Sequence, residues 1–407
     1  MTEAATDQRN HALDVVRAGA LLLGIVLHGT ISFWPGFREA NYPVADDYDS
    51  AVMSGLYFVL HIFRMSLFYA IAGFFSHLLF VRLGLWGFVK NRLRRIALPL
   101  VAGLIVTLPL IIVAYFWAHR VRGITGPPDM SPPIPDPQMP PWGHLWFLYL
   151  LLVLYALWLS GRALLCAMDR RGRIPDLVER AIGAMVAGRV GPILLAAPAA
   201  AAMYLAPWWI PWQGIPQPIM GLVPNLPSVL AFGAAFGFGW FLHRQQAWLD
   251  LLKRDWSIYL LAAVALTAGA MALVGAVPQI HVPVMEPRDR AAFAAAYNIG
   301  GWCWIFGLIG AAQRFLDRPS ARWRYLADSS FFVYLMHLPV SYLLSTWVIH
   351  WPWYWAFKFV FIVGVTAGIS LLMYHYLVRS TFVGQFLNGR TYPRNSRVIS
   401  APSTSPG

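Results

Sequence analysis

The segment LDVVRAGALLLGIVLH, residues 13–28, carries Asp14, Arg17 and His28 within an otherwise apolar run. A helix turns 100° per residue, so positions eleven apart differ by about 20° and lie roughly 16 Å apart along the axis. Arg17 and His28 therefore share one face, and Gly24 and Asp14 fall on that face too. The face offers a carboxylate and a guanidinium for binding charged groups, and a deeper imidazole for proton transfer.

Two explanations fit the first two of these residues. Asp14 and Arg17 can form an ion pair at the cytoplasmic end of the helix, with the arginine extending to the interface, or they can bind a ligand. His28 lies too deep for the first explanation, because ionisable groups at that depth face a bundle interior or a water-filled cavity. We predict a functional role for His28 and leave both explanations open for the pair.

A second apolar segment, HIFRMSLFYAIAGFF, carries His61 and Arg64 three residues apart in the outer half of the membrane. A buried arginine there can pin helices through backbone carbonyls, or it can line a cavity that contacts a hydroxylated or anionic acceptor. Both remain open.

The segment SSFFVYLMHLP places Ser330 and His337 seven residues apart on nearly one face, with Tyr334 three residues before the histidine. Counted inward from the cytoplasm, His337 reaches the same mid-bilayer depth as His28, which predicts a shared cavity. A third ligand at matching depth is not evident, so we expect no metal.

The segment PWGHLWFLYL places His144 and Trp146 at the outer rim of another apolar run. An aromatic belt at the interface accounts for the tryptophan, and the role of His144 stays open. The histidines in loops, near the ends of apolar runs or beside no polar partner are interpreted as structural: His77, His119, His243, His281, His350 and His375.

The composition is that of an integral membrane protein. Hydrophobic residues make up 58% of the chain and charged residues 12%, against roughly 25% charged in soluble domains. The net charge of +13 arises from basic residues between apolar runs, which argues against nucleic acid as a partner. The two cysteines, Cys166 and Cys303, provide neither a disulfide framework nor a cysteine metal site.

The expected fold is an all-α bundle of about ten transmembrane helices, because a span needs about 20 apolar residues and only a helix satisfies its own backbone there. The expected spans are 15–34, 56–80, 96–117, 144–160, 190–206, 226–243, 256–276, 291–311, 328–349 and 355–378. They form a single polytopic domain over residues 13–387. A cytoplasmic segment, 1–12, precedes it, and a disordered cytoplasmic tail, 388–407, follows it.

Basic residues predict the orientation of the bundle. With the N-terminus in the cytoplasm, 23 of the 31 Lys and Arg residues fall in inner segments and six in outer connections. Such asymmetry predicts that both termini are cytoplasmic. The outer connections 118–143 and 207–227 are dense in proline and are expected to form rigid caps rather than helices. No internal repeat is visible, which counts against transporter folds built from paired halves.

Five blocks in order resemble the membrane acyltransferase 3 family, whose first helix carries arginine, ten residues and histidine. The blocks are LDVVRAGALLLGIVLH, HIFRMSLFYAIAGFFS, NRLRRIALPL, HLWFLYLLL and SSFFVYLMHLP, and the resemblance extends over about residues 10–390. The chain also resembles a subgroup of inner-membrane proteins implicated in succinylating osmoregulated periplasmic glucans. It departs from the family at Ala72, where serine is usual, and from the subgroup at Leu338, where a second histidine can occur.

The resemblance implies transfer of an acyl group from cytoplasmic acyl-CoA to a hydroxyl of a periplasmic or exported carbohydrate, in the bacterial inner membrane. Succinyl-CoA or acetyl-CoA is then a co-substrate, and no cofactor is expected to be tightly bound. The expected catalytic residues are His28, Arg17 and His337. The expected substrate-binding residues are Asp14, His61, Arg64, His144, Trp146, Ser330 and Tyr334, and Arg92, Arg94 and Arg95 are expected to attract the phosphates of the donor.

Several alternatives stay open at this stage. Neutral His28 is expected to act as general base, but a covalent acyl-imidazole on the same residue is the variant. A transporter or flippase for a lipid-linked or anionic solute would also need histidines and arginines at mid-bilayer depth, and a scaffolding protein would tolerate changes at His28. The acyl group, the acceptor and the oligomeric state are not determined by the sequence.

Overall fold

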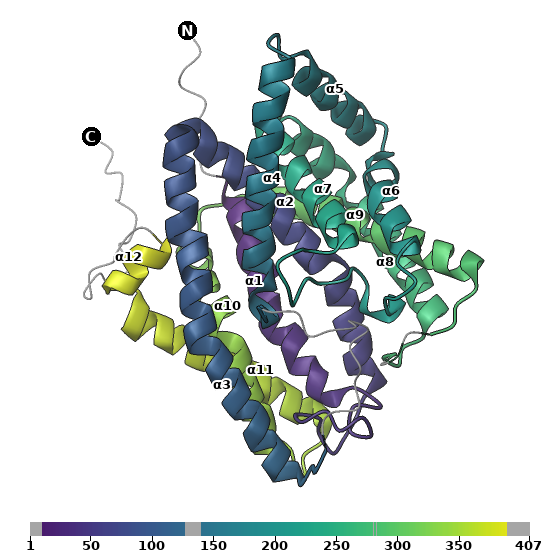
Figure 1. Ribbon diagram of the computed structural model, residues 1–407, viewed down its shortest axis with the longest axis vertical. Coiled ribbons are helices and arrows are strands. Elements are labelled where there is room, and N and C mark those ends of the chain that lie inside the picture. Colours follow the sequence, from purple (N-terminus) through teal and green to yellow (C-terminus); the bar gives the residue numbers. More distant parts are fainter. Residues whose placement is uncertain (1–9, 127–139, 280, 282, 389–407) are drawn as a thin grey trace, which may run out of the picture.

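The computed structural model describes residues 10–126, 140–279, 281 and 283–388, which form a bundle of α-helices (Figure 1). No β-strand occurs in these ranges, apart from an isolated bridge between Pro141 and Met220. The helices are α1 His11–Thr30, α2 Ala51–Arg92, α3 Leu98–Arg122, α4 Trp146–Met168, α5 Arg173–Ala187, α6 Gly191–Tyr204, α7 Leu226–Arg244, α8 Trp248–Val274, α9 Pro287–Phe315, α10 Ala321–Val348, α11 Trp355–Met373 and α12 Phe382–Asn388. The predicted tail beyond residue 388 and the predicted N-terminal segment before residue 10 lie outside the described ranges.

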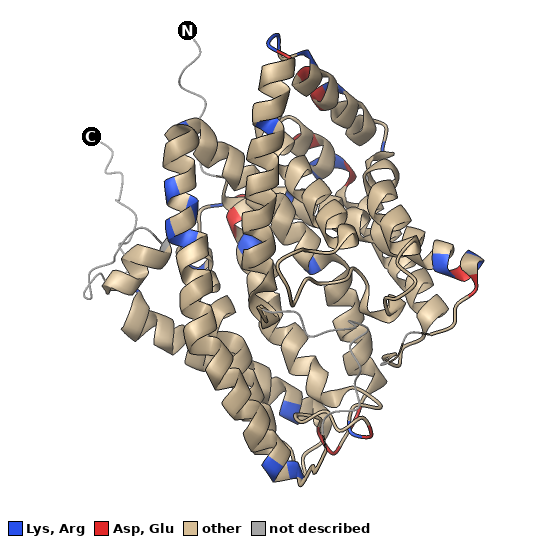
Figure 2. Ribbon diagram, in the orientation of Figure 1, with Lys and Arg blue, Asp and Glu red and all other residues tan. Residues whose placement is uncertain are grey.

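The described part of the chain contains eight helices long and apolar enough to cross a membrane, or nine if the bent pair α5 and α6 is counted as one span. Figure 2 shows few charged residues along the middle of these helices. The prediction of an all-α, multi-pass membrane protein is therefore confirmed. The count of ten spans and the orientation of the termini stay predictions.

One of the eight candidates, Ala51–Arg122, is 72 residues long, although about 20 residues suffice to cross a bilayer. Gly84 lies inside it with a φ of 65°, in the left-handed region that glycine adopts without steric penalty. The chain bends there, and Figure 1 shows α2 and α3 as separate arms of the bundle. The run was predicted as two spans, 56–80 and 96–117, and the helical structure continues between them.

Helix α5 lies within a stretch that the sequence predicts only as a basic inner connection. It is amphipathic: Ile182 and Val186 are buried, while Arg173 is exposed. The axis of α6 is bent by 113° from that of α5. Arg189, in the corner between them, has a φ of 60° and donates hydrogen bonds to Asp255 of α8 at 3.0 and 2.9 Å.

Helix α1 packs against α2, α9, α10 and α11. Its first turn is fixed by Asn10, whose side chain accepts a hydrogen bond from the Leu13 backbone N–H at 3.0 Å. Gln313 of α9 donates to the same Asn10 oxygen at 3.0 Å. Because a capping residue fixes where a helix begins, these contacts set the register of every polar residue along α1.

Helices α2 and α7 approach each other closely at two glycines. A Cβ added to Gly73 would lie 1.9 Å from the Phe236 carbonyl oxygen, and one added to Gly239 would lie 1.7 Å from the Ala70 carbonyl oxygen. Small residues at a helix crossing in a membrane allow this backbone-to-backbone contact. The crossing holds the second half of α2, and the residues it carries, against α7.

Gly239→Ala should destabilise the protein by about 2 kcal/mol, because the added methyl group meets rigid backbone and forces the helices apart. Gly269→Ala in α8 is the matched control, since nothing lies within 4 Å of its added Cβ. Thermal unfolding midpoints in detergent should be lower for the first variant only. Equal midpoints would contradict the close approach.

Candidate active site

A cavity of about 560 Å³ lies at the end of the bundle where α1 begins. Its walls come from α1, α2, α4, α7, α10 and the segment that joins α2 to α3. Asn10 and Leu387, near the two ends of the described chain, both line it, so these two ends lie on the same side of the molecule. Four arginines line this inner cavity, together with two carboxylates: Arg17, Arg82, Arg92, Arg95, Asp14 and Asp328.

Asp14 and Arg17 form the ion pair that their spacing allows, with 3.0 Å between Oδ1 and Nη2. The Arg17 guanidinium also lies 4.9 Å from the centroid of the Phe75 ring. Both charged residues line the inner cavity, so the pair faces a space that can hold a ligand. The structural and ligand-binding explanations for this pair are therefore compatible.

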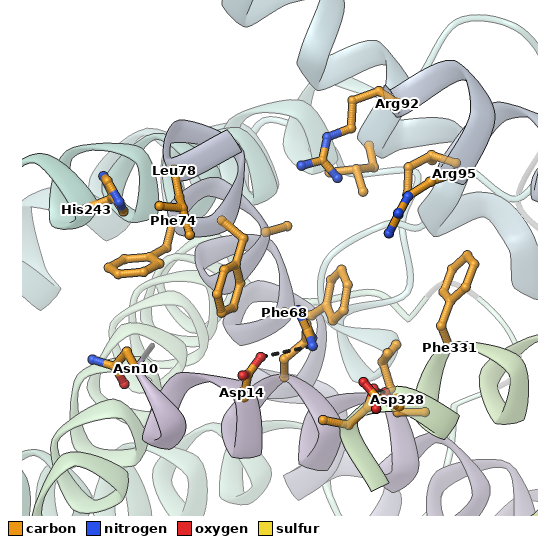
Figure 3. A pocket seen from close by; sticks show the side chains of 18 of the residues that line it. Asn10, Asp14, Phe68, Phe74, Leu78, Arg92, Arg95, His243, Asp328 and Phe331 are labelled. Carbon is orange, nitrogen blue, oxygen red and sulfur yellow. Dashed lines mark hydrogen bonds and ion pairs between the residues drawn. The ribbon is translucent and has the colours of Figure 1, made fainter. Parts of the chain in front are cut away.

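Of the three arginines predicted to attract phosphates, two line the inner cavity and one does not. Arg92 and Arg95 line the inner cavity, whereas Arg94 is exposed and does not. Residues Leu93–Ala97 form a π-helical turn, a distortion that is frequent at functional sites. Figure 3 shows Arg92 and Arg95 on the side of the cavity opposite Asp14.

A second cavity of about 370 Å³ lies farther along α1, beyond the inner one, and is the outer cavity. Its walls include α1, α2, α3, the start of α4, α10 and the connection between α6 and α7. Aromatic side chains dominate it: Tyr42, Tyr57, Tyr115, Trp142, Trp146, Phe147, Tyr334 and Tyr342. No Asp or Glu of the described chain lines it, and its ionisable groups other than tyrosine are His28, Arg64 and His144.

The tyrosines of this outer cavity are neutral hydrogen-bonding groups. Tyr42, in the connection between α1 and α2, lies 3.0 Å from Tyr342, hydroxyl to hydroxyl. Burial raises the pKa of Tyr42 well above its ordinary value, and the nearby phenols of Tyr115 and Tyr342 raise it further. The wall is therefore aromatic and uncharged at this point.

Three histidines from three segments meet beside the outer cavity. The rings of His28 and His337 have centroids 5.2 Å apart, and those of His144 and His337 are 6.0 Å apart. His28 and His337 therefore lie side by side, as a common depth requires, but only His28 lines the outer cavity, so the predicted shared cavity is not what the structure shows. His144, whose role was open, belongs to the same group.

His337 is held in one tautomer by its own helix. Its Nδ1 lies 2.7 Å from the Tyr334 carbonyl oxygen, and a carbonyl can only accept, so Nδ1 carries the hydrogen. Nε2 then has a free lone pair, and it is buried without a hydrogen-bond partner among the described residues. His28 Nδ1 is likewise buried and unpartnered. Two imidazoles with unused ring nitrogens therefore lie side by side.

Arg64 of α2 lies against α1 and α10, beside Gly24 and His337. Its side chain is buried, its Nε has no hydrogen-bond partner and no carboxylate of the described chain lies within ion-pair distance. A Cβ added to Gly24 would lie 2.7 Å from Arg64 Nη1 and 3.4 Å from His337 Nε2. The missing side chain at Gly24 is thus what allows the guanidinium to lie beside the histidines.

His61 does not line the outer cavity, although it was predicted to bind substrate. Its Nδ1 lies 3.1 Å from the Tyr297 hydroxyl, and its Nε2 is hydrogen-bonded to the Gln217 side-chain amide. Its ring stacks on Tyr57, with centroids 5.1 Å apart. Gln217 and Tyr57 do line the cavity, so His61 holds the residues that face it.

The remaining predicted residues are divided between the two cavities. Ser330 lines the inner one and donates a hydrogen bond to the Ala327 carbonyl at 3.0 Å. Tyr334, His144 and Trp146 line the outer one. The Tyr334 hydroxyl donates to the His144 carbonyl at 2.6 Å, which ties α10 to the turn just before α4.

One histidine pair was missed by the sequence analysis. His77 of α2 and His243 of α7 were interpreted only as structural, with no pairing between them, but their Nδ1 atoms are 2.7 Å apart. His243 lines the inner cavity beside Gln246. The residues are 166 positions apart, and only the glycine contact between α2 and α7 brings them together, so no local pattern could reveal the pair.

Among the described residues, no group of three His, Cys, Asp or Glu side chains is arranged to hold a metal ion. The expectation that no metal takes part stays a prediction.

The fold and the two cavities define a multi-pass membrane protein with a cationic inner site and an aromatic outer site beside a group of histidines. A family model described as an acyltransferase domain matches residues 10–375. The chain belongs to this acyltransferase 3 family, as its five sequence blocks indicate.

Similar curated proteins are named glucans biosynthesis protein C. Those of Shigella dysenteriae serotype 1 (strain Sd197) and Escherichia coli (strain K12) are 28% identical over 158 residues, and that of Escherichia coli O139:H28 (strain E24377A / ETEC) is 29% identical. The match covers 38% of this chain and 40% of the length of each of these proteins. No solved structure matches the chain.

Gly24→Ala should lower the acyl-transfer rate by roughly 100-fold, because the added methyl group would lie 2.7 Å from Arg64 Nη1 and must push the guanidinium away from its place beside the histidines. The protein should still fold, since the contact is with the flexible end of a side chain. Gly19→Ala on the same helix meets nothing within 4 Å and should keep the wild-type rate. An active Gly24→Ala variant would show that the position of Arg64 is unimportant.

Proposed function

We propose that this protein transfers an acyl group from acyl-CoA, bound in the inner cavity, to a hydroxyl of a carbohydrate bound in the outer cavity. The observation that carries the proposal is that the two cavities lie one beyond the other along α1, with His28 and Arg64 lining the outer one and His337 packed behind His28. A bacterial inner-membrane location with the inner cavity open to the cytoplasm suits this reaction. The excess of basic residues in the predicted inner segments supports that orientation.

The inner cavity suits a phosphate-rich donor. Arg17, Arg82, Arg92 and Arg95 line it, and clustered cations raise the local concentration of anions. Guanidinium groups bind phosphate with two parallel hydrogen bonds. From this end, the pantetheine arm of the donor would extend along α1 toward His28.

The outer cavity suits an uncharged sugar. Its aromatic walls can pack against the apolar faces of sugar rings, and tyrosine hydroxyls with the Gln217 amide can bond to sugar hydroxyls. The name of the similar proteins, glucans biosynthesis protein C, supports a carbohydrate acceptor. A periplasmic glucan is the acceptor we favour.

The chemistry needs one base and one cation. Neutral His28 takes the proton of the acceptor hydroxyl as the hydroxyl oxygen attacks the thioester carbonyl carbon. Arg64 stabilises the oxyanion of the tetrahedral intermediate, which a preorganised charge in a water-poor site does efficiently. The carbon–sulfur bond then breaks, and the proton on His28 passes to the departing thiolate, which gives the ester and free coenzyme A. His337, with its fixed tautomer, positions the acceptor hydroxyl.

The acyl group is either succinyl or acetyl. A succinyl group carries a free carboxylate that requires a cation, and Arg64 or Arg17 can supply one. An acetyl group requires none. The transfer uses no tightly bound cofactor and no metal.

His28→Ala should reduce acyl transfer by at least about 100-fold, since a positioned general base typically contributes this much or more. The test is release of coenzyme A from acyl-CoA by purified protein in detergent, with and without a glucan acceptor. His375→Ala, which removes a histidine that lines neither cavity, is the control and should keep wild-type activity. Wild-type turnover in the His28 variant would overturn the general-base role. Absence of any coenzyme A release by the wild-type protein would favour a transporter or flippase instead.

Arg17→Ala should raise the KM for acyl-CoA with little change in kcat, because its guanidinium is proposed to bind the donor in ground state and transition state alike. The expected increase is about tenfold, the loss of a single charge-assisted hydrogen-bonding partner. Arg94→Ala, which removes an exposed arginine outside the cavity, should leave the KM unchanged. An unchanged KM in the Arg17 variant would leave the arginine with its structural role beside Asp14.

A further inference from the structure

Phe147 is the one residue of the described chain that lines both the inner and the outer cavity. It lies in the first turn of α4, and its side chain is 1% exposed. Every other residue that lines the two cavities faces only one of them. The side chain of Phe147 therefore lies in the wall that separates them.

The ring of Phe147 packs against an aromatic ring on each side of this wall, and it also meets the Tyr69 ring at 5.8 Å between centroids. Phe68, which lines the inner cavity, meets it edge to face at 4.5 Å between centroids, and Tyr334, which lines the outer cavity, meets it edge to face at 5.1 Å. The rings of Phe68, Phe147 and Tyr334 come from α2, α4 and α10. They form an apolar partition at the level where the cavities come closest.

The backbone at Phe147 is fixed, although its ring is held only by packing. The Tyr69 hydroxyl donates a hydrogen bond to the Phe147 carbonyl at 3.0 Å, and the Tyr334 hydroxyl donates to the His144 carbonyl at 2.6 Å. A side chain on a fixed backbone can change rotamer without moving its helix. Any movement of the Phe147 ring would therefore be a change of rotamer on a backbone that stays in place.

An enzyme that takes one substrate from each side of a membrane faces a physical conflict. The acyl thioester must pass from the inner cavity to His28, but a permanently open passage would also admit water and protons. Apolar constrictions resolve such conflicts in channels, because they expel water until a group that fits them enters. Excluding water also protects a thioester from hydrolysis.

We propose that Phe147 is the gate between the donor and acceptor cavities: its ring closes the passage at rest and swings aside to admit the acyl arm. The passage of the acyl arm rests on the proposed function, whereas the seal against water and protons does not. The gate makes Phe147 a positioning residue that controls access, since it supplies no group to the reaction.

The first experiment tests the seal without acyl-CoA. Phe147→Ala and Phe147→Leu are reconstituted into liposomes that contain a pH-sensitive dye, and the decay of an imposed pH gradient is followed. Phe147→Ala should dissipate the gradient at least about tenfold faster than the wild-type protein, since removing an apolar constriction allows a water path to form. The rate for Phe147→Leu should lie between those of Phe147→Ala and the wild-type protein.

Phe306→Ala in α9 is the matched control. Phe306 is also fully buried, and it packs among Phe238, Tyr259 and Trp302, away from both cavities. The same truncation there removes the same volume from a core but opens no path. Equal leak rates for Phe147→Ala and Phe306→Ala, with both proteins folded as judged by unfolding midpoints, would overturn the seal.

The second experiment measures how tightly coenzyme A release depends on the presence of the acceptor. Phe147→Ala in detergent should release coenzyme A from acetyl-CoA without acceptor at a higher rate than wild type, because water reaches the thioester. An unchanged acceptor-free rate in an active enzyme would overturn the gate. If the wild-type protein releases no coenzyme A under any condition, the proposed function fails, and the proton leak still decides whether Phe147 seals the two cavities.

Discussion

The close contact between Arg64 and the backbone of α1 at Gly24 is the constraint on which the candidate site depends. A buried guanidinium without a carboxylate partner in the described chain is costly, because burial removes its water and nothing charged replaces it. Its location is fixed by two features. The glycine crossing of α2 with α7 sets the depth of α2, and the absent side chain at Gly24 lets the guanidinium approach His337. A charge held in this way is preorganised for an anion that forms only during a reaction.

The second organising feature is the way that two helices pass both cavities. Helix α1 lines the inner cavity as far as Leu21 and the outer cavity from Leu27 onward. Helix α10 lines the inner cavity as far as Phe331 and the outer cavity from Tyr334 onward. Six residues of helix correspond to about 9 Å and three to about 4.5 Å. The wall between the cavities is therefore thin enough for one aromatic ring to occupy. Because α1 and α10 are both helical across this interval, a change of side-chain rotamer could open the wall without breaking either helix.

The sequence was sufficient for the features that depend on helix periodicity and hydropathy. Apolar runs predicted the all-helical membrane fold, and the eleven-residue spacing predicted that Arg17 and His28 share a face. Counting residues from one side predicted a common depth for His28 and His337, whose rings are 5.2 Å apart. Each of these inferences needs only one helix at a time and the thickness of a bilayer.

Other features depend on which helices are neighbours, and periodicity does not contain that information. The pairing of His77 with His243 requires the α2–α7 crossing, and the supporting position of His61 requires Gln217 from a proline-rich connection. The exposure of Arg94, by contrast, agrees with periodicity alone: Arg92 and Arg95 are three residues apart and share a helix face, whereas Arg94 is turned about 200° from Arg92.

The two cavities differ in how much of their walls comes from connections, and this difference bears on how acceptors are selected. The inner cavity is built mostly from helices, whereas the outer one includes Tyr42, Trp142 and Gln217 from connections. Connections tolerate substitution better than packed helices, because fewer contacts depend on them. Under the proposed function, the donor is the same molecule throughout and requires a fixed site, while the acceptor is the variable partner. A rigid helical frame with an acceptor wall borne partly on loops lets one half of the site change while the reacting groups on α1, α2 and α10 keep their geometry.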